Sequence, residues 1–156
     1  MRKLIYLVFA VTLISSGCAS RATRSLNKGK AAYEKHDYLH ALEFFNDAVK
    51  YDSLNASVYY QRGIAKRAVR INAVGIAFIS GQPKSKNPGW NPTSFASEID
   101  DYTRAIQINP VYKEAFFSRA MARIESHQAD SACSDFRIAI ELGSSDAKEA
   151  ISEYCK

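Results

Sequence analysis

The chain has 156 residues, of which 47% are hydrophobic and 24% are charged, and its formal net charge is +5. This balance is typical of one globular domain and excludes wholesale disorder and fibrous sequence classes. Three cysteines are too few for a small domain held together by several disulfides. The positive charge alone does not indicate nucleic-acid binding, because the sequence has no basic stripe with interleaved aromatic residues.

The N-terminus has the features of an export signal. Two basic residues at positions 2 and 3 are followed by an apolar run over residues 4–14 that only Thr12 interrupts. A short basic start, an apolar centre and a small-residue exit are the marks of a signal peptide. The run is too short to span a bilayer, which takes about 20 apolar residues. We therefore expect residues 1–17 to be a signal peptide that is removed; a retained membrane anchor is the alternative.

Residues 16–18, Ser-Gly-Cys, resemble the bacterial lipobox, in which small residues precede a cysteine that is lipidated and becomes the new N-terminus. Ser15 stands where that motif usually has Leu. The resemblance implies that Cys18 carries the lipid and that residues 18–21 tether the domain to a bacterial membrane, at the periplasmic side or the surface of the outer membrane. The alternative is ordinary cleavage after Ala19, which gives a soluble periplasmic or secreted protein.

Three segments of the chain share one spacing, with successive intervals of four, three and five residues. Their third aromatic residue follows the second by 34 positions, whereas the second follows the first by 57, which is 23 more than the same period. A fixed period of this length is the mark of a repeat architecture. The middle unit is therefore predicted to hold a 23-residue insertion. The three segments are Ala41, Phe45, Ala48 and Ser53; Glu98, Tyr102, Ala105 and Pro110; and Ala132, Phe136, Ala139 and Ser144.

Intervals of three and four residues place these side chains on one face of a helix. A small residue opens a second pattern upstream of each segment, at Gly29, Gly63 and Ala120. Small residues let two helices approach closely, and the aromatic residue fills the space that remains. Each unit is thus predicted to be a pair of antiparallel helices whose open face is covered by stacking on the next unit.

This pattern resembles the tetratricopeptide repeat (TPR) family, with a segment such as DYTRAIQINP at 101–110. The resemblance implies an all-α fold of three helical hairpins in a right-handed superhelix, closed by a C-terminal capping helix. Glu98 departs from the family pattern, which has a small residue there. The TPR domain is expected over residues 22–156. Its parts are expected at about 22–55, at about 56–112 with the insertion at about 68–93, at about 113–145, and in the cap at 146–156.

The helices are predicted in chain order from the same spacing and from the turn residues between them. Ser145 or Asp146 is predicted to cap the last helix, since short polar side chains accept hydrogen bonds from the first free amide groups. Alternation typical of a strand is conceivable only within residues 73–79. The predicted ranges are about 22–36, 38–52, 56–72, 94–108, 112–127, 129–142 and 146–154.

Cys133 and Cys155 lie at equal distances, 11 residues, on either side of a turn centred near Ser144. In an antiparallel helical hairpin, equal distances from the turn place residues side by side, because both helices rise about 1.5 Å per residue. An exported protein meets oxidising conditions. We therefore predict a Cys133–Cys155 disulfide that fastens the capping helix. The alternative is two reduced cysteines packed in the same seam.

The resemblance to TPR proteins implies a groove that binds a peptide or protein segment and is lined by the first helix of each unit. The mixture of aromatic, aliphatic and basic groups favours a segment with apolar and acidic residues. The carboxylate clamp found in some members is not reproduced, because Ile64 and Met121 stand at equivalent places. For each residue, plain packing between repeats is the alternative. The expected groove residues are Leu26, Lys30, Tyr33, Glu34, Tyr60, Ile64, Arg67, Phe117, Met121, Ile124 and Glu125.

The insertion runs from basic through apolar to turn-rich sequence and contains the single tryptophan, Trp90. One interpretation is a lengthened helix followed by a long loop that packs over the array. The other is a loop that contacts a partner or a membrane through Trp90, since long loops in compact domains are often functional.

The sequence contains no motif for a catalytic triad, a phosphate loop or a zinc protease. Histidines 36, 40 and 127 are expected at turns or on the surface. We therefore expect no catalytic residues, no metal and no cofactor. The predicted function is a non-catalytic interaction scaffold or assembly factor at the bacterial cell envelope, with a protein or peptide partner. An accessory subunit of an envelope enzyme or secretion complex that uses the insertion is the alternative, and self-association stays open.

Overall fold

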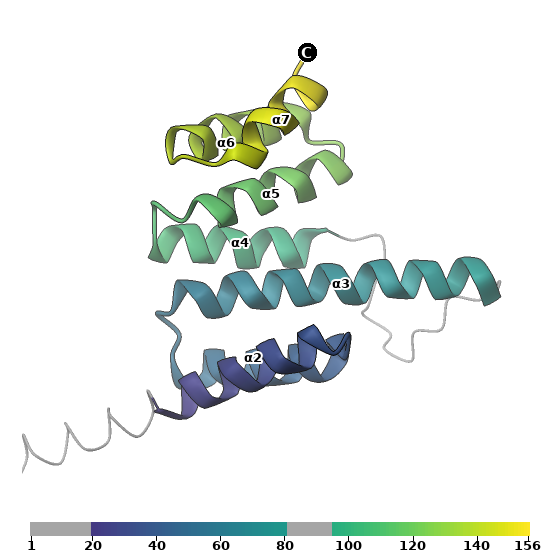
Figure 1. Ribbon diagram of the computed structural model, residues 1–156, viewed down its shortest axis with the longest axis vertical. Coiled ribbons are helices and arrows are strands. Elements are labelled where there is room, and N and C mark those ends of the chain that lie inside the picture. The colour runs from purple at the N-terminus through teal and green to yellow at the C-terminus, as the bar shows by residue number, and fades with distance from the viewer. Residues whose placement is uncertain (1–19, 81–94) are drawn as a thin grey trace, which may run out of the picture.

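The described parts of the chain, residues 20–80 and 95–156 of a computed structural model, consist of helices joined by short turns. Successive helices stack one after another along the longest axis of the molecule, from the N-terminal hairpin at one end to the C-terminal helix at the other (Figure 1). The expected signal peptide, Cys18 and Trp90 lie outside the described residues. The predicted all-α helical-hairpin array is confirmed.

Seven helices lie within the described residues, in the order that the spacing predicts. Most of the predicted boundaries agree with the observed ones to within two residues, and the main exception is the third helix. The helices are residues 20–34, α2 (Tyr38–Tyr51), α3 (Ala56–Ser80), α4 (Ala96–Ile108), α5 (Lys113–Glu125), α6 (Ala129–Glu141) and α7 (Ser145–Tyr154).

Helix α3 continues to Ser80, eight residues past its predicted end, and projects beyond the ends of its neighbours (Figure 1). The strand-type alternation considered for residues 73–79 is therefore wrong. Extending an existing helix adds one hydrogen bond per residue without a new nucleation cost, and the first proline of the insertion comes only at Pro83. The lengthened-helix interpretation of the insertion holds for this stretch of backbone. Its remainder, residues 81–94, lies outside the described residues.

Each hairpin is closed by a small residue of its first helix against an aromatic ring of its second. A methyl group at Gly63 would lie 2.6 Å from a ring carbon of Tyr102, and one at Gly29 would lie 2.5 Å from a ring carbon of Phe45. No larger residue fits there without displacing the ring. Both rings are fully buried. The close approach predicted from the spacing is present in these two units.

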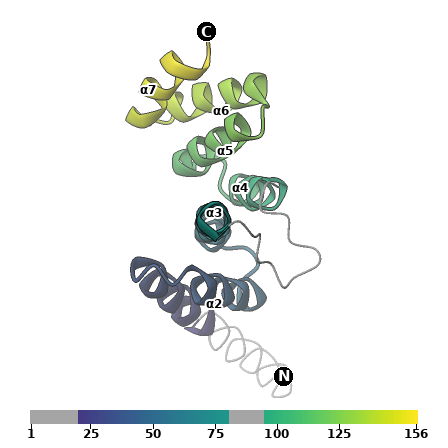
Figure 2. The ribbon, with the colours of Figure 1, turned by 90° about the vertical axis from the view of Figure 1, so that its right-hand side faces the viewer.

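The hairpins stack so that each helix packs mainly on its neighbours in the chain (Figure 2). The contacts of α3 with α4 and of α5 with α6 are the most extensive, and α4 joins the second unit to the third. Tyr59, Ala105 and Ala115 form the buried core at that junction. A second core around Phe116 and Phe136 holds the C-terminal helices together. The array therefore has a succession of small cores rather than one large one.

The last helix begins one residue earlier than predicted. Ser144, not Ser145 or Asp146, is the N-cap of α7, and its hydroxyl accepts a hydrogen bond from the amide of Ala147 at 3.3 Å. The hydroxyl of Ser145 instead donates to the Asp146 carboxylate. The extended backbone of Ser144 aims its side chain at the first turn, whereas Ser145 is already helical.

Cys133 of α6 and Cys155, the residue that follows α7, form a disulfide in the structure. Their sulfur atoms are 2.00 Å apart and their Cα atoms 5.7 Å apart. The bridge ties the end of α7 to the beginning of α6. Cys133 is buried at this seam, and Cys155 is half-buried.

Thiol counting tests this bridge. A Cys18→Ser variant that is purified without reductant and then denatured should show no reactive thiol, and two after reduction. Reduction should also lower the free energy of unfolding by about 3 kcal/mol, because the bridge closes a loop of about 20 residues in the unfolded chain. Two reactive thiols before reduction would contradict the pairing.

Candidate functional site

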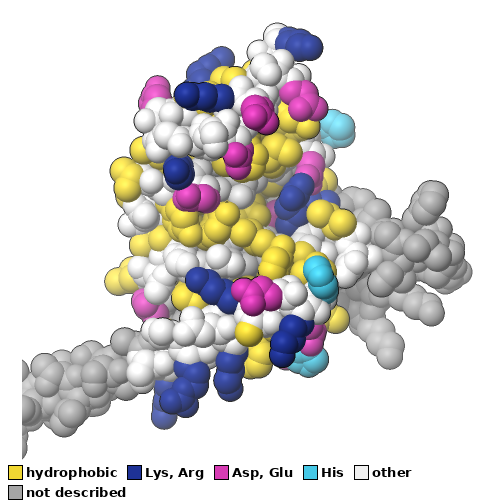
Figure 3. All heavy atoms as spheres, in the orientation of Figure 1, with side chains coloured by type: hydrophobic (Ala, Val, Ile, Leu, Met, Phe, Trp, Pro, Cys, Tyr) yellow, Lys and Arg dark blue, Asp and Glu magenta, His cyan; other side chains and the backbone are white. Residues whose placement is uncertain are grey.

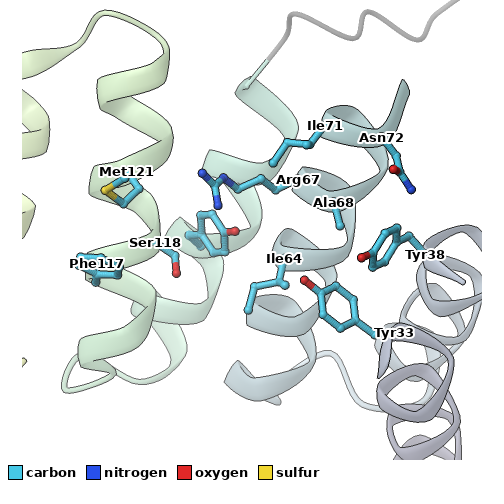
Figure 4. Close-up of a pocket in the computed structure, with 11 residues that line it drawn as sticks. Tyr33, Tyr38, Ile64, Arg67, Ala68, Ile71, Asn72, Phe117, Ser118 and Met121 are labelled. Carbon is cyan, nitrogen blue, oxygen red and sulfur yellow. The ribbon is translucent and has the colours of Figure 1, made fainter. Parts of the chain in front are cut away.

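A cavity of about 360 Å³ lies between the first hairpin, α3 and α5. Figure 4 shows Tyr33 and Tyr38 approaching α3 from one side, while Phe117, Ser118 and Met121 project from α5 on the other. The walls are mostly aromatic and aliphatic, with a few polar groups among them. The residues that line the cavity are Tyr33, Tyr38, Ile64, Arg67, Ala68, Ile71, Asn72, Tyr102, Phe117, Ser118 and Met121.

Five of the eight groove residues singled out from the sequence line this cavity, and three do not. Lys30 is half-buried on the first helix away from it. Tyr60 packs its ring against Tyr112, with ring centres 4.9 Å apart, and belongs to the junction of the second and third units. Ile124 packs against the C-terminal core. The five that line the cavity are Tyr33, Ile64, Arg67, Phe117 and Met121.

Sequence reasoning missed six lining residues, and helical spacing could have found half of them. Ala68, Ile71 and Asn72 continue the face of α3 that carries Ile64, at intervals of four, seven and eight residues. The prediction stopped at Arg67 because the insertion was placed from residue 68. Tyr102 belongs to the second helix of its hairpin, so a rule that assigns the groove to first helices cannot find it.

The polar side of the cavity is a network of two arginines and two glutamates. Arg67 pairs with Glu125 of α5, and Nη2 of Arg70 donates to Glu125 at 2.6 Å and to Glu98 at 3.0 Å. The Arg70 guanidinium also lies over the ring of Phe95, 4.1 Å from its centre. This explains the acidic residue at 98, where the TPR pattern has a small one, because its buried carboxylate is the partner of Arg70.

The two glutamates of this network differ in the direction of their pKa shifts. Burial raises the pKa of Glu98 above its usual value, and the hydrogen bond from Arg70 offsets this only in part. Burial also works to raise the pKa of Glu125, but hydrogen bonds from Arg67 and Arg70 hold it below its usual value. Glu125 therefore stays ionised and is the group that neutralises both arginines.

A second set of ion pairs joins the two helices within a hairpin. Asp101 is buried on α4 and accepts from Arg62 at 2.5 Å and from Lys66 at 2.8 Å. One period of 34 residues later, Asp135 is bound in the same way, by Arg119 at 2.7 Å and Arg123 at 2.6 Å. In the first unit the position of the aspartate is Phe44, and Lys28 lies over its ring. These contacts reinforce the hairpins that carry the cavity walls.

The described residues hold neither a metal-binding cluster nor a membrane-spanning helix. Within residues 20–80 and 95–156, no group of three or more histidine, cysteine, aspartate or glutamate side chains is arranged to hold a metal. No helix in the same ranges is long and apolar enough to cross a membrane. The three histidines are exposed: His36 and His127 sit at hairpin turns with φ of 61°, and His40 pairs with Asp37.

No protein-family model and no curated protein sequence matches the chain. Solved structures do. The Arabidopsis OM64 TPR domain superposes with a TM-score of 0.71 at 23% identity, over 88% of this chain and 96% of that one. The fold is that of a TPR domain.

Other TPR domains superpose about as well. The second TPR domain of human RPAP3, solved with the HSP70 peptide SGPTIEEVD, gives a TM-score of 0.68 at 19% identity, over 91% of this chain and 98% of that one. The TPR2B domain of yeast Sti1, in a complex with pHsp70, gives 0.63 at 21% identity, over 86% and 94%. At these identities the similarity shows the shared fold and no more.

Replacing Asp101 tests the ion pairs within the hairpins. Asp101→Asn should lower the free energy of unfolding by about 3 kcal/mol, because it leaves two half-buried cations without their carboxylate. Its neighbour Asp100 is exposed, so Asp100→Asn should change stability by less than about 0.5 kcal/mol. Urea denaturation followed by circular dichroism measures both. Equal effects would show that the buried pairs contribute no more than a surface charge.

Proposed function

We propose that this TPR domain is a non-catalytic scaffold that binds a segment of a protein partner in the cavity between the first hairpin, α3 and α5. The observation that carries the proposal is the cavity itself, which has apolar and aromatic walls and a few polar groups. This is the composition of sites that bind ligands by shape and a small number of hydrogen bonds. The peptides named with the RPAP3 domains support a scaffold role for this fold.

The walls of the cavity come from three separate repeat elements held at fixed distances by the hairpin contacts. Tyr33 and Tyr38 supply one wall, α3 the floor, and α5 the other wall (Figure 4). Ile71 lies at this site with 51% of its surface exposed, although it is a large aliphatic residue. A partner side chain that covers it would remove apolar surface from water, and that term drives most protein association.

We further propose that the domain works at the bacterial cell envelope, attached through a lipid on Cys18. The N-terminal pattern of basic, apolar and small residues supports this, as does the lipobox-like segment at 16–18. Helix is already formed at residue 20, and Ala22 is buried. The tether would therefore be only a few residues long, about 3.5 Å each at most, and would hold the domain close to the bilayer. A soluble periplasmic or secreted protein is the alternative.

Metabolic labelling with a palmitate analogue tests the anchor. The full chain produced in a bacterial host should incorporate the label, and a Cys18→Ala variant should not, because the acyl group needs that sulfur. The label should also follow the protein into the membrane fraction. Unlabelled, soluble wild-type protein with a mature N-terminus elsewhere would support ordinary export instead.

The projection of α3 beyond its neighbours favours a second candidate function (Figure 1). An accessory subunit of an envelope enzyme or secretion complex would be contacted through the insertion rather than through the cavity. Trp90 would be its anchor in that case, since a large aromatic residue in a protein interface often carries much of the binding energy.

Substitutions at two exposed aliphatic residues separate the cavity from the rest of the surface. Ile71→Lys places a charge in the cavity, whereas Leu54→Lys does so at the turn between α2 and α3, where Leu54 is 72% exposed. Both variants should keep the helical circular dichroism spectrum. In a pulldown from detergent-solubilised envelope, Leu54→Lys should retain a stoichiometric partner and Ile71→Lys should lose at least nine-tenths of it.

The same pulldown has two contrary outcomes. Retention of the partner by Ile71→Lys would place the contact outside the cavity and favour the insertion. Absence of a stoichiometric partner from the wild-type eluate would contradict a scaffold function.

A further inference from the structure

Two polar atoms that belong to cavity-lining residues are buried and have no hydrogen-bond partner: Oη of Tyr102 and Nε of Arg67. Tyr102 has no exposed surface at all, and its ring is fixed against Gly63. Arg67 uses its Nη2 for Glu125, which leaves Nε unused. The great majority of buried polar side-chain atoms in proteins do have a partner, so two orphans in one cavity require an explanation.

Both orphans are hydrogen-bond donors. Burial raises the pKa of the Tyr102 phenol well above its usual value, so that the hydroxyl keeps its proton. Nε of a guanidinium carries a proton at any accessible pH and cannot accept. What is missing from the cavity is therefore an acceptor, such as a carbonyl or a carboxylate oxygen.

The charges around the cavity decide between these acceptors. Arg67 and Arg70 are already paired with Glu125, and Arg70 also with Glu98. Two positive and two negative groups balance, and the remaining lining residues are uncharged. A carboxylate that entered would lose its hydration without gaining an unpaired cation and would meet the field of Glu125. A neutral carbonyl oxygen has no such penalty.

The walls decide what accompanies the carbonyl. Ile64, Phe117 and Met121 offer apolar surface, and Tyr33 and Tyr38 offer aromatic edges. A volume of about 360 Å³ is at the lower end of the range for small-ligand sites. It suits one large side chain with its own backbone rather than several residues.

We propose that the cavity is a pocket for one uncharged aromatic or aliphatic residue within a partner segment, whose main-chain carbonyl oxygens accept hydrogen bonds from Tyr102 Oη and Arg67 Nε. The proposal rests on the groove function above and specifies its ligand. It differs from the sequence expectation of an acidic segment, because Glu125 supplies the negative charge from within the protein. It also differs from the acidic ends of the peptides named with the RPAP3 structures.

A peptide library tests this specificity. The probe is a set of hexapeptide mixtures with blocked ends, in which one central position is fixed as Phe, Leu, Ser, Lys or Glu and all others are varied. The peptide SRMEEVD with a free carboxylate is the acidic comparison. The full chain should retain the Phe and Leu mixtures at least tenfold better than the Lys and Glu mixtures and at least tenfold better than SRMEEVD.

Removing single hydroxyl groups tests the role of Tyr102. Tyr102→Phe should weaken binding of the Phe mixture about threefold to tenfold, which is the effect of one lost hydrogen bond. Its urea midpoint should be unchanged or raised, because an unsatisfied buried hydroxyl is removed. Tyr112→Phe is the matched control, since the Tyr112 hydroxyl is bonded to Ser57 outside the cavity. It should bind like wild type and have a lowered urea midpoint.

The contrary outcomes separate this inference from the function beneath it. Preference for the Glu mixture or for SRMEEVD, or unchanged binding by Tyr102→Phe, would overturn the inference and leave a peptide-binding groove in place. Retention of no peptide of any class would overturn both.

Discussion

The contact between a glycine of one helix and an aromatic ring of the next governs the structure. In the second hairpin, Gly63 lets the Tyr102 ring lie so close that a single added methyl group would collide with it. That contact closes the hairpin and brings Asp101 within reach of Arg62 and Lys66. It also fixes where the Tyr102 hydroxyl ends, among the residues of the cavity. One packing constraint thus positions both a stabilising ion pair and a recognition group.

Much of the fold was predictable because the constraint repeats with a fixed period. Intervals of 34 residues between Tyr102 and Phe136, and small residues at fixed distances before them, are visible without a structure. The cavity residues at Tyr33 and Arg67 followed from helical position alone. What could not be predicted depends on distant partners: the pairs of Arg70 with Glu98 and Glu125 span 28 and 55 residues of sequence. No local pattern announces such pairs.

The network around Arg70 changes what the cavity can recognise. Read from the sequence, basic residues on the groove face favour an acidic ligand, but the structure neutralises them from within the protein through Glu125. The binding surface that remains is apolar and aromatic, with two unpaired donors beneath it. Such a surface selects by fit and by desolvation rather than by charge. Rejection of charged segments would follow from the cost of burying them.

The account places the partner on the cavity side of the array and not on its other faces. Photocrosslinking in the producing cell tests this most directly, with a photoreactive residue at Asn72, which is exposed and lines the cavity, or at Arg137, which is exposed on α6. The account predicts an adduct with one partner protein from position 72 and none from position 137. An adduct from position 137 without one from position 72 would contradict it.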